Sequence, residues 1–347
     1  MKINSMRVAM YYSNKDIRVQ EVPVPKISPD ELLVKVTACG ICGSDVMEWY
    51  RADRVPLVLG HEIAGVIVKK GRNVKKYKEG NRISAAHHLP CGDCKYCRVS
   101  QETVCETLRR TNFYPGGFSE YLRLPEINVT KGTFLLPDGV SDEEATFIEP
   151  LGCVLRGQRQ AGLKPWHSLL VIGSGIAGIL HIALARARKI KRIIATDVEN
   201  ERLKMAQRFG ADFCFNAEDY TPEKLLDINS GQKADVVVIA TGALPAIKQA
   251  LESVDRSGTV LFFAPTDKDK TIELNVNNLF WRNEIILLST YAANPEEHRQ
   301  ALKFIKEKRI NVREMITHRL KLQDTQEGFR LVSEAKESLK VIVNPQD

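Results

Sequence analysis

The sequence contains no long hydrophobic run and no export signal. No apolar stretch approaches the roughly 18 residues of a membrane-spanning helix. The stretch from Met1 to Asp16 lacks the apolar core of a secretory signal peptide. Internal repeats, low-complexity tracts and coiled-coil heptads are absent as well. We therefore expect a cytoplasmic protein with no membrane partner.

The composition is that of an ordinary globular protein. The chain has 347 residues, of which 44% are hydrophobic and 27% charged, so it can bury a large core and we expect two domains. Its formal charge of +7 is spread along the chain, apart from one basic cluster between Lys69 and Lys78 in a turn-like stretch. This charge suits an anionic cofactor or an acidic substrate and does not require a nucleic-acid partner.

A glycine-rich turn halfway along the chain predicts a dinucleotide site. The apolar run Leu169 to Ile172 predicts a buried strand, and apolar residues then recur at helical spacing from Ile176 to Ala187. Glycines between strand and helix allow a tight turn, close approach of a pyrophosphate and close packing of the helix, whose N-terminus attracts phosphate. The candidate cofactor residues in this turn are Gly173, Gly175, Ile176, Ala177 and Gly178.

The next predicted strand, 192–197, ends at Asp197, where this fold places a ribose-binding carboxylate. Asp197 would repel a 2′-phosphate, so we expect NAD in preference to NADP. The alternative is that Asp197 only caps the helix predicted over 199–209. Arg202 either lies near the adenosine ribose or is a surface charge, and Thr241, after the predicted strand 235–240, is a further cofactor candidate.

The pattern of elements changes near residue 150. Short alternating stretches separated by Pro, Gly and Asn turns predict an all-β region before it. Strands and helices alternate from 168 to 290, which predicts a doubly wound parallel sheet. Two helices, 296–308 and 325–336, and a strand, 339–343, are expected to follow. The strands expected in the parallel sheet are 168–173, 192–197, 213–215, 235–240, 258–263 and 285–290.

Four of the eight cysteines predict a structural zinc site. Cys91, Cys94, Cys97 and Cys105 are close enough in sequence to form a closed tetrahedral shell of thiolates. An iron–sulfur loop would have its fourth cysteine nearer and a proline after it. Without a secretion signal, metal binding is favoured over disulfide bonds.

A second, dispersed set of residues offers ligands for a catalytic zinc. Cys42, His61 and Glu149 supply one thiolate, one imidazole and one carboxylate, and three protein ligands leave a position for water or substrate. Spacing alone gives only weak support, because a single cysteine or histidine is common in protein cores.

The order of all these motifs resembles the zinc-dependent medium-chain alcohol dehydrogenases, and most of all their sorbitol and threonine dehydrogenase branch. The resemblance spans nearly the whole chain. It implies a GroES-like, β-barrel-type catalytic domain from 1–154 and 291–347, a Rossmann NAD-binding domain from 155–290, and a homodimer or homotetramer. The motifs that carry it are Gly40 to Asp45, Gly60-His61-Glu62, the four cysteines, Gly117 to Tyr121, Glu149-Pro150-Leu151, the glycine turn and Ile316 to Arg319.

The resemblance also implies a role for each matching residue. Cys42 and His61 would bind the catalytic zinc with Glu149, while Glu62 would be a ligand or a close neighbour that alternates with Glu149. Asp45 would orient His61 through its other ring nitrogen. The four cysteines 91, 94, 97 and 105 would bind the structural zinc. Lys340 matches a basic residue that contacts the cofactor pyrophosphate.

Two features depart from the family pattern. Met47 occupies the position of a histidine that passes the reaction proton to solvent, although Ser44 can still accept the proton from the alcohol. Cys153 follows Glu149 along a predicted helix and is expected to be a packed thiol, as are Cys39 and Cys214. The substrate-pocket candidates, equally open to a role in the domain core, are Trp49, Tyr50, Phe118 and Arg51.

The resemblance implies an enzyme that transfers hydride between a secondary alcohol or polyol and NAD in the cleft between the domains. Zinc would lower the pKa of the substrate hydroxyl, and NAD would accept the hydride. Threonine, another amino alcohol or an acyl-CoA-linked alcohol are alternative substrates. A catalytically inactive NAD-binding relative is a further alternative because of Met47. A zinc-containing nucleic-acid binder is more remote, because it leaves the glycine turn unexplained.

Overall fold

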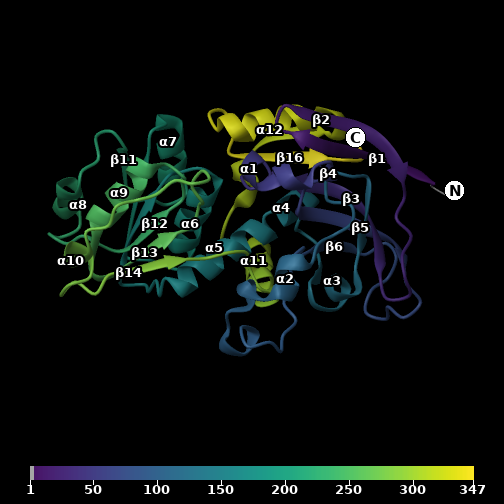
Figure 1. Ribbon diagram of the computed structural model, residues 1–347, viewed down its shortest axis with the longest axis horizontal. Coiled ribbons are helices and arrows are strands. Elements are labelled where there is room, and N and C mark those ends of the chain that lie inside the picture. Colours follow the sequence, from purple (N-terminus) through teal and green to yellow (C-terminus); the bar gives the residue numbers. More distant parts are fainter. Residues whose placement is uncertain (1–3) are drawn as a thin grey trace. The chain divides into compact units, whose positions relative to one another are not determined.

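The computed structural model describes residues 4–347 and divides the chain into two compact units (Figure 1). The first unit contains the residues up to Gly152 together with Ala292–Asp347, and the second contains Cys153–Tyr291. The first unit is therefore made of two separate stretches of chain, with the second unit inserted between them.

The second unit is built on a six-stranded parallel sheet. Its strand order, β11-β10-β9-β12-β13-β14, is that of a doubly wound Rossmann sheet, so the predicted sheet is confirmed. Its strands are β9 (Ser168–Ile172), β10 (Arg192–Asp197), β11 (Phe213–Asn216), β12 (Ala234–Ile239), β13 (Val254–Phe262) and β14 (Ile286–Ser289). Its helices are α6 (Ile176–Ala187), α7 (Asn200–Arg208), α8 (Pro222–Ile228), α9 (Leu244–Ser253) and α10 (Val276–Leu279).

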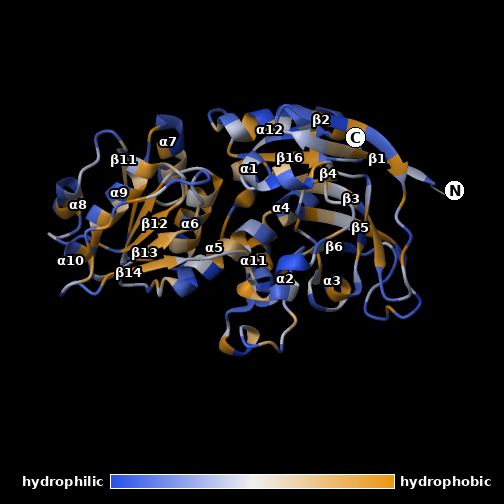
Figure 2. Cartoon of the chain, viewed as in Figure 1, coloured by the Kyte–Doolittle hydropathy of each residue, from blue (hydrophilic) through white to orange (hydrophobic). Residues whose placement is uncertain are grey.

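Burial explains why these segments become central strands. All five residues of β9 are buried, because strands pair with it on both sides and helix α6 packs against it. A strand covered on both faces reads as a continuous hydrophobic run. Figure 2 shows the same hydrophobic character in most of β12 and in the second half of β13.

The first unit is built mainly of antiparallel strands. A seven-stranded sheet has the order β15-β16-β3-β5-β6-β8, with β7 also paired to β3, and a three-stranded sheet has the order β2-β1-β4. The strands are β1 (Ser5–Ser13), β2 (Asp16–Pro23), β3 (Leu32–Gly40), β4 (Leu57–Val58), β5 (Glu62–Lys70), β6 (Arg82–Ala85), β7 (Tyr121–Leu124), β8 (Thr133–Leu135), β15 (Ile316–Lys321) and β16 (Lys340–Asn344).

Short helices connect these strands where the sequence predicts only β structure. Most have four to six residues, too few for a helical period to be visible. Helix α5, with 13 residues, begins in the first unit and ends in the second. Within residues 4–347, no helix has both the length and the apolar character needed to cross a membrane. The helices here are α1 (Glu48–Arg51), α2 (Glu106–Arg110), α3 (Glu126–Lys131), α4 (Asp142–Ala145), α5 (Ile148–Gln160), α11 (Pro295–Lys306) and α12 (Thr325–Glu334).

Four neighbouring strands bring their ends together at one edge of the seven-stranded sheet. Strand β3 ends at Gly40, which lies opposite Glu62 at the start of β5. Strand β6 ends beside the same part of β5, because Ala85 pairs with Ile63. On the other side of β3, strand β16 begins at Lys340 and its Ile342 lies opposite Gly40. The residues just beyond these strand ends therefore converge.

Candidate catalytic metal centre and nucleotide-binding turn

The converging strand ends hold a cluster of potential metal ligands. The ligand atoms of Cys42, His61 and Glu62 lie within 4.8 Å of one another, and so do those of His61, His87 and Glu149. We call these five residues the metal pocket. It gathers four residues expected from the sequence and adds His87, which sequence reasoning missed.

Asp45 fixes the ligands on either side of it. Its carboxylate is fully buried; Oδ2 accepts a hydrogen bond from the Cys42 backbone N–H at 3.1 Å, and Oδ1 lies 3.4 Å from His61 Nδ1. Arg51 lies 3.7 Å from the same carboxylate. Burial opposes ionisation of Asp45, but His61 and Arg51 outweigh it and hold the pKa of the carboxyl below its ordinary value. A carboxylate in this place orients the imidazole so that its other nitrogen faces a metal.

Asp45 and Cys42 also shift the pKa of His61. Burial alone would lower the pKa of His61, yet Asp45 and the Cys42 sulfur raise it well above the ordinary value. Surroundings that favour a positive charge on an imidazole also favour a cation bound to it. Metal binding at this point would therefore displace a proton.

Ser44 lies directly beside the Cys42 sulfur. Its hydroxyl is 3.4 Å from Cys42 Sγ, and its carbonyl oxygen accepts two hydrogen bonds from the Arg51 guanidinium. Arg51 therefore stabilises the turn that carries the ligands, and its positive charge faces Asp45. Met47 directly precedes helix α1 and offers no titratable group.

Lys340 lies in a different place from the one the sequence suggests. We expect it to contact the cofactor pyrophosphate, but its side chain is 1% exposed and its ammonium forms an ion pair with Glu62. It also donates to the Ile41 carbonyl oxygen at 3.4 Å. A buried cation that is already paired is not open to a phosphate, so we correct the assignment: Lys340 is the counter-ion of Glu62.

Lys340 offsets part of the negative charge of the metal pocket. Burial disfavours its protonation, but Glu62, Cys42 and Glu149 together raise its pKa above the ordinary value. Gly40 makes room for the ion pair, since a Cβ atom there would come within 2.1 Å of the Glu62 carboxylate and 2.8 Å of the Lys340 ammonium.

Glu149 enters the metal pocket from the first turn of α5 and is 8% exposed. The N-terminal turn of a helix stabilises a carboxylate electrostatically. Cys153 lies farther along the same helix and is partly buried. Among the described residues, its thiol does not belong to either of the ligand clusters of the metal pocket.

His87 follows strand β6 and faces His61. Their ring centroids are 4.6 Å apart, and the His87 ring also lies 3.8 Å from that of His88 and 6.2 Å from that of Phe113. Burial lowers the pKa of His87 well below its ordinary value. Two adjacent histidines carry no spacing signature, and only the pairing of β6 with β5 shows that one of them reaches the metal pocket.

The expected substrate-pocket residues divide into two groups. Phe118 is 1% exposed and packs edge-on against Phe329, with ring centroids 5.8 Å apart, so it belongs to the hydrophobic core and not to a pocket. Trp49 is 42% exposed and lies edge-on to Tyr50. The guanidinium of Arg51 stacks on the Tyr50 ring.

The four cysteines of the loop 91–105 form a compact thiol cluster. The sulfurs of Cys94 and Cys97 are 3.5 Å apart, those of Cys91 and Cys105 are 3.6 Å apart, and those of Cys91 and Cys97 are 3.9 Å apart. Four thiolates bound to one zinc ion would lie about 3.8 Å from one another. The cluster therefore fits a structural zinc ion.

The glycine turn of the second unit has the geometry that a pyrophosphate requires. Gly173 has φ = 93°, and a Cβ atom on Gly178 would come within 1.9 Å of the Gly173 carbonyl oxygen. A Cβ atom on Gly175 would instead meet only the tip of Arg202, at 3.9 Å. Gly175 is thus the glycine that leaves open space at the N-terminus of α6. Ile176 and Ala177, both partly exposed, form the first turn of that helix.

Asp197 lies beside this turn at the end of β10. Its Oδ2 accepts a hydrogen bond from the Ser174 N–H at 2.6 Å, and its Oδ1 accepts one from the Glu199 N–H at 2.9 Å. Arg202 is 3.8 Å from the same carboxylate. Asp197 thus joins the glycine turn to the start of α7. Thr241 follows β12, and its hydroxyl accepts from the Ala243 N–H at 3.4 Å.

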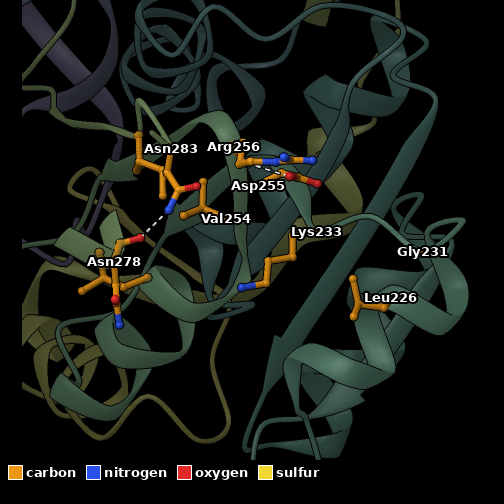
Figure 3. A pocket seen from close by; sticks show the side chains of 10 residues that line it. Leu226, Gly231, Lys233, Val254, Asp255, Arg256, Asn278 and Asn283 are labelled. Atoms are coloured by element: carbon orange, nitrogen blue, oxygen red, sulfur yellow. Dashed lines mark hydrogen bonds between the residues drawn. The ribbon is translucent and has the colours of Figure 1, made fainter. Parts of the chain in front are cut away.

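A surface hollow in the second unit contains none of the expected site residues (Figure 3). It lies next to Lys233 and Val254, near the starts of β12 and β13. Asn283 donates a hydrogen bond to the Asn278 carbonyl oxygen at its rim. In doubly wound sheets ligands bind at the carboxyl ends of the strands, where the glycine turn lies. The hollow lies at the opposite, amino-terminal ends of the strands, where a dinucleotide is not expected to bind.

Taken together, the fold and the metal pocket define a zinc-binding oxidoreductase with a separate nucleotide-binding unit. Thiolate, imidazole and carboxylate are ligands that zinc accepts in catalytic sites. Residues 28–138 match the family model of the alcohol dehydrogenase GroES-like domain, and residues 177–307 match that of the zinc-binding dehydrogenases. The chain belongs to the zinc-dependent medium-chain alcohol dehydrogenase family, which confirms the expected fold and family.

Its relatives include enzymes of both expected substrate classes. The chain is 30% identical to a sorbitol dehydrogenase of Bacillus subtilis, covering 98% of both chains. It is 32% identical to an L-threonine 3-dehydrogenase of Bacillus licheniformis, covering 90% of both. A zinc-binding dehydrogenase of Sinorhizobium meliloti, solved with NADP bound, is 27% identical with a TM-score of 0.87, and the match covers 98% of this chain and 99% of that one.

Proposed function

We propose that this protein is a polyol dehydrogenase that transfers hydride between a secondary hydroxyl group and NAD. The observation that carries the proposal is the metal pocket with the Ser44 hydroxyl beside it. The similarity to a sorbitol dehydrogenase over 98% of both chains supports a polyol as the substrate.

In this proposal Cys42, His61 and Glu149 hold the catalytic zinc, and the four-cysteine loop holds the structural one. The Glu62 carboxylate is paired with Lys340, which favours Glu149 as the resting carboxylate ligand. When bound, the catalytic zinc supplies Lewis acidity that lowers the pKa of an alcohol. The Ser44 hydroxyl would accept the proton of the substrate hydroxyl while passing its own proton onward, and Asp45 holds His61 in its orientation.

The second unit binds the cofactor in this proposal. Gly175 and the N-terminus of α6 receive the pyrophosphate, while Gly173 and Gly178 keep the turn tight. Asp197 accepts hydrogen bonds from the adenosine ribose and disfavours a 2′-phosphate. One relative was solved with NADP bound, so the test below measures activity with both NAD and NADP.

The proposed partner is a second copy of the chain. Strand β14 is an edge of the parallel sheet, and its Ile286 is 54% exposed. Nearby in the sequence, Trp281 is 71% exposed. An apolar sheet edge is a site at which another strand can be added, so a homodimer, or a homotetramer made of such dimers, would cover it.

The test is to measure absorbance of the reduced cofactor with NAD or NADP and a panel of sorbitol, xylitol, simple secondary alcohols and L-threonine. Each active pair is then repeated after removal of zinc with a chelator and again after zinc is restored. We expect NAD reduction with polyols, loss on chelation and recovery with zinc. Oxidation of L-threonine in preference to every polyol would replace the proposed substrate class. A fully zinc-loaded protein that binds NAD and oxidises no alcohol would refute the activity.

A further inference from the structure

His87 is an unused hydrogen-bonding side chain inside the metal pocket. Across residues 4–347, neither of its ring nitrogens takes part in a hydrogen bond, and its side chain is only partly buried. The neighbouring His88 differs, because its Nδ1 is bonded to the Thr111 carbonyl oxygen at 2.8 Å. His87 therefore has both a donor and an acceptor available for a ligand.

The backbone holds His87 firmly in place. The Ala86 N–H donates to the Gly132 carbonyl oxygen at 2.8 Å. The buried amide of Asn128 donates to the carbonyl oxygens of both Ala86 and His87, at 2.7 and 3.3 Å. The imidazole is thus presented from a rigid strand end, and rigid elements make precise binding sites.

The position of His87 relative to the other ligands suggests what it binds. Its nearest ring nitrogen lies within 4.8 Å of the ligand atoms of both His61 and Glu149. A substrate whose reacting hydroxyl approaches these ligands brings the substituents of the adjacent carbon close to His87. A neutral imidazole offers one donor and one acceptor, which matches a hydroxyl group that both accepts and donates.

We propose that His87 binds the hydroxyl group on the carbon next to the one oxidised, and so makes the enzyme selective for vicinal diols over monohydric alcohols. This inference rests on the proposed function and defines its substrate class more narrowly. A site built to bond a hydroxyl group discriminates against the analogue that lacks it, because the protein group is then left unpaired.

The test compares 2,3-butanediol with 2-butanol, which have the same carbon skeleton and differ by one hydroxyl group. Steady-state kinetics with NAD are measured for the zinc-loaded wild type and for His87→Phe, His87→Gln and His167→Phe. His167→Phe is the matched control, because it makes the same exchange before β9, where His167 Nδ1 accepts a hydrogen bond from the Lys164 N–H. Zinc content is measured for every variant.

We expect the wild type to prefer the diol. His87→Phe should reduce the ratio of kcat/KM for diol to kcat/KM for 2-butanol by about tenfold or more, mainly through KM for the diol. His87→Gln, which retains a donor and an acceptor, should preserve more of the ratio. His167→Phe should leave the ratio unchanged, and zinc content should stay constant throughout.

Four results would overturn the inference. An equal loss on both alcohols in His87→Phe would show a general structural role, and loss of zinc in both His87 variants would make His87 a metal ligand. A wild type that prefers 2-butanol would leave the proposed dehydrogenase activity standing and refute the diol class. A zinc-loaded wild type that oxidises neither alcohol with NAD or NADP would refute the proposed function and this inference with it.

Discussion

At the scale of single residues, the metal pocket is a problem of charge balance. Cys42, Glu62 and Glu149 bring negative charge into a poorly solvated space, and Lys340 is the buried cation that offsets part of it. Burial of unpaired charges is costly, so the pocket is stable only with such counter-ions. A bound zinc ion would complete the compensation.

Cys42→Ser tests the thiolate at this pocket. A hydroxyl is a poor zinc ligand, so we expect loss of catalytic zinc and a fall in kcat of at least about a hundredfold, with the fold retained. Metal analysis, far-UV circular dichroism and NAD reduction measure the three quantities. Cys214→Ser, at a partly buried thiol in β11, is the matched control. Wild-type activity in Cys42→Ser would exclude Cys42 as a catalytic ligand.

Long-range contacts explain which residues the sequence did and did not reveal. Cys42, His61 and the glycine turn belong to motifs whose neighbours in sequence are also their neighbours in space. The ion pair of Lys340 with Glu62 joins positions 278 residues apart, and no sequence pattern around either residue predicts it. Phe118 shows the opposite difficulty, because an aromatic residue in a motif looks the same whether it lines a pocket or fills a core.

At the scale of structural elements, the cysteine loop contributes stability more than chemistry. It has only short helical turns, such as Cys97–Val99 and Glu102–Val104, and little hydrophobic packing of its own. A loop of this kind depends on its metal for a fixed structure.

Cys94→Ser should therefore destabilise the protein while leaving the metal pocket intact. We expect the free energy of unfolding to fall by about 2 kcal/mol or more and one equivalent of zinc to be lost. Thermal unfolding and metal analysis provide the measurements, with Cys214→Ser again as control. An unchanged melting temperature together with an unchanged zinc content would show that the loop needs no metal.

The turn after β10 gives a separate prediction about the cofactor. Asp197→Asn keeps an oxygen that can accept from the Ser174 N–H but removes the negative charge. We expect the preference for NAD over NADP, as a ratio of kcat/KM values, to fall by about tenfold because the 2′-phosphate is no longer repelled. Asp219→Asn, at an exposed aspartate of the same unit, is the control. An unchanged ratio would mean that Asp197 serves only to join the turn to α7.

At the scale of the whole molecule, buried histidines link stability to pH. His181 lies in the core of the second unit, edge-on to Phe263 with ring centroids 4.5 Å apart, and within residues 4–347 neither ring nitrogen has a hydrogen-bond partner. Burial lowers its pKa to about 3, and burial lowers that of His298 in the first unit to about 4. Both side chains are therefore neutral in the folded protein at pH 7.

Acid should destabilise the protein in part through these two residues. The unfolded chain takes up their protons below its ordinary histidine pKa of about 6.5, and the folded chain does not until about 3 to 4. Stability should thus fall as the pH drops from 6.5 to 4, by up to about 1.4 kcal/mol per pH unit for each histidine. Denaturant unfolding at several pH values measures this slope.

His181→Leu provides the matched comparison. It removes one titrating group and two unpaired polar atoms from the core, so we expect a shallower slope and higher stability at pH 5. His318→Leu, at a partly exposed histidine, should leave the slope unchanged. The same slope in His181→Leu and wild type would show that His181 is not buried in its neutral form.

The two units differ in how much of their architecture the sequence predicts. In the second unit strands and helices alternate along the chain. Hydrophobic runs separated by turns therefore predict the strands of the parallel sheet. The first unit depends on pairing between distant segments, with β16 between β15 and β3, and no local pattern predicts that order. Sequence patterns reveal strands, whereas strand order in such a sheet depends on long-range packing.

The place of β16 in that sheet has a consequence for synthesis of the chain on the ribosome. The second unit is complete once Tyr291 has been translated, but the first unit lacks a central strand and the Lys340 cation until β16 has been translated. Growing chains therefore hold their metal ligands beside an unfinished sheet. A message truncated near its 3′ end therefore yields a chain with a complete second unit and all five residues of the metal pocket, but without the Lys340 counter-ion and without the strand that lies between β15 and β3.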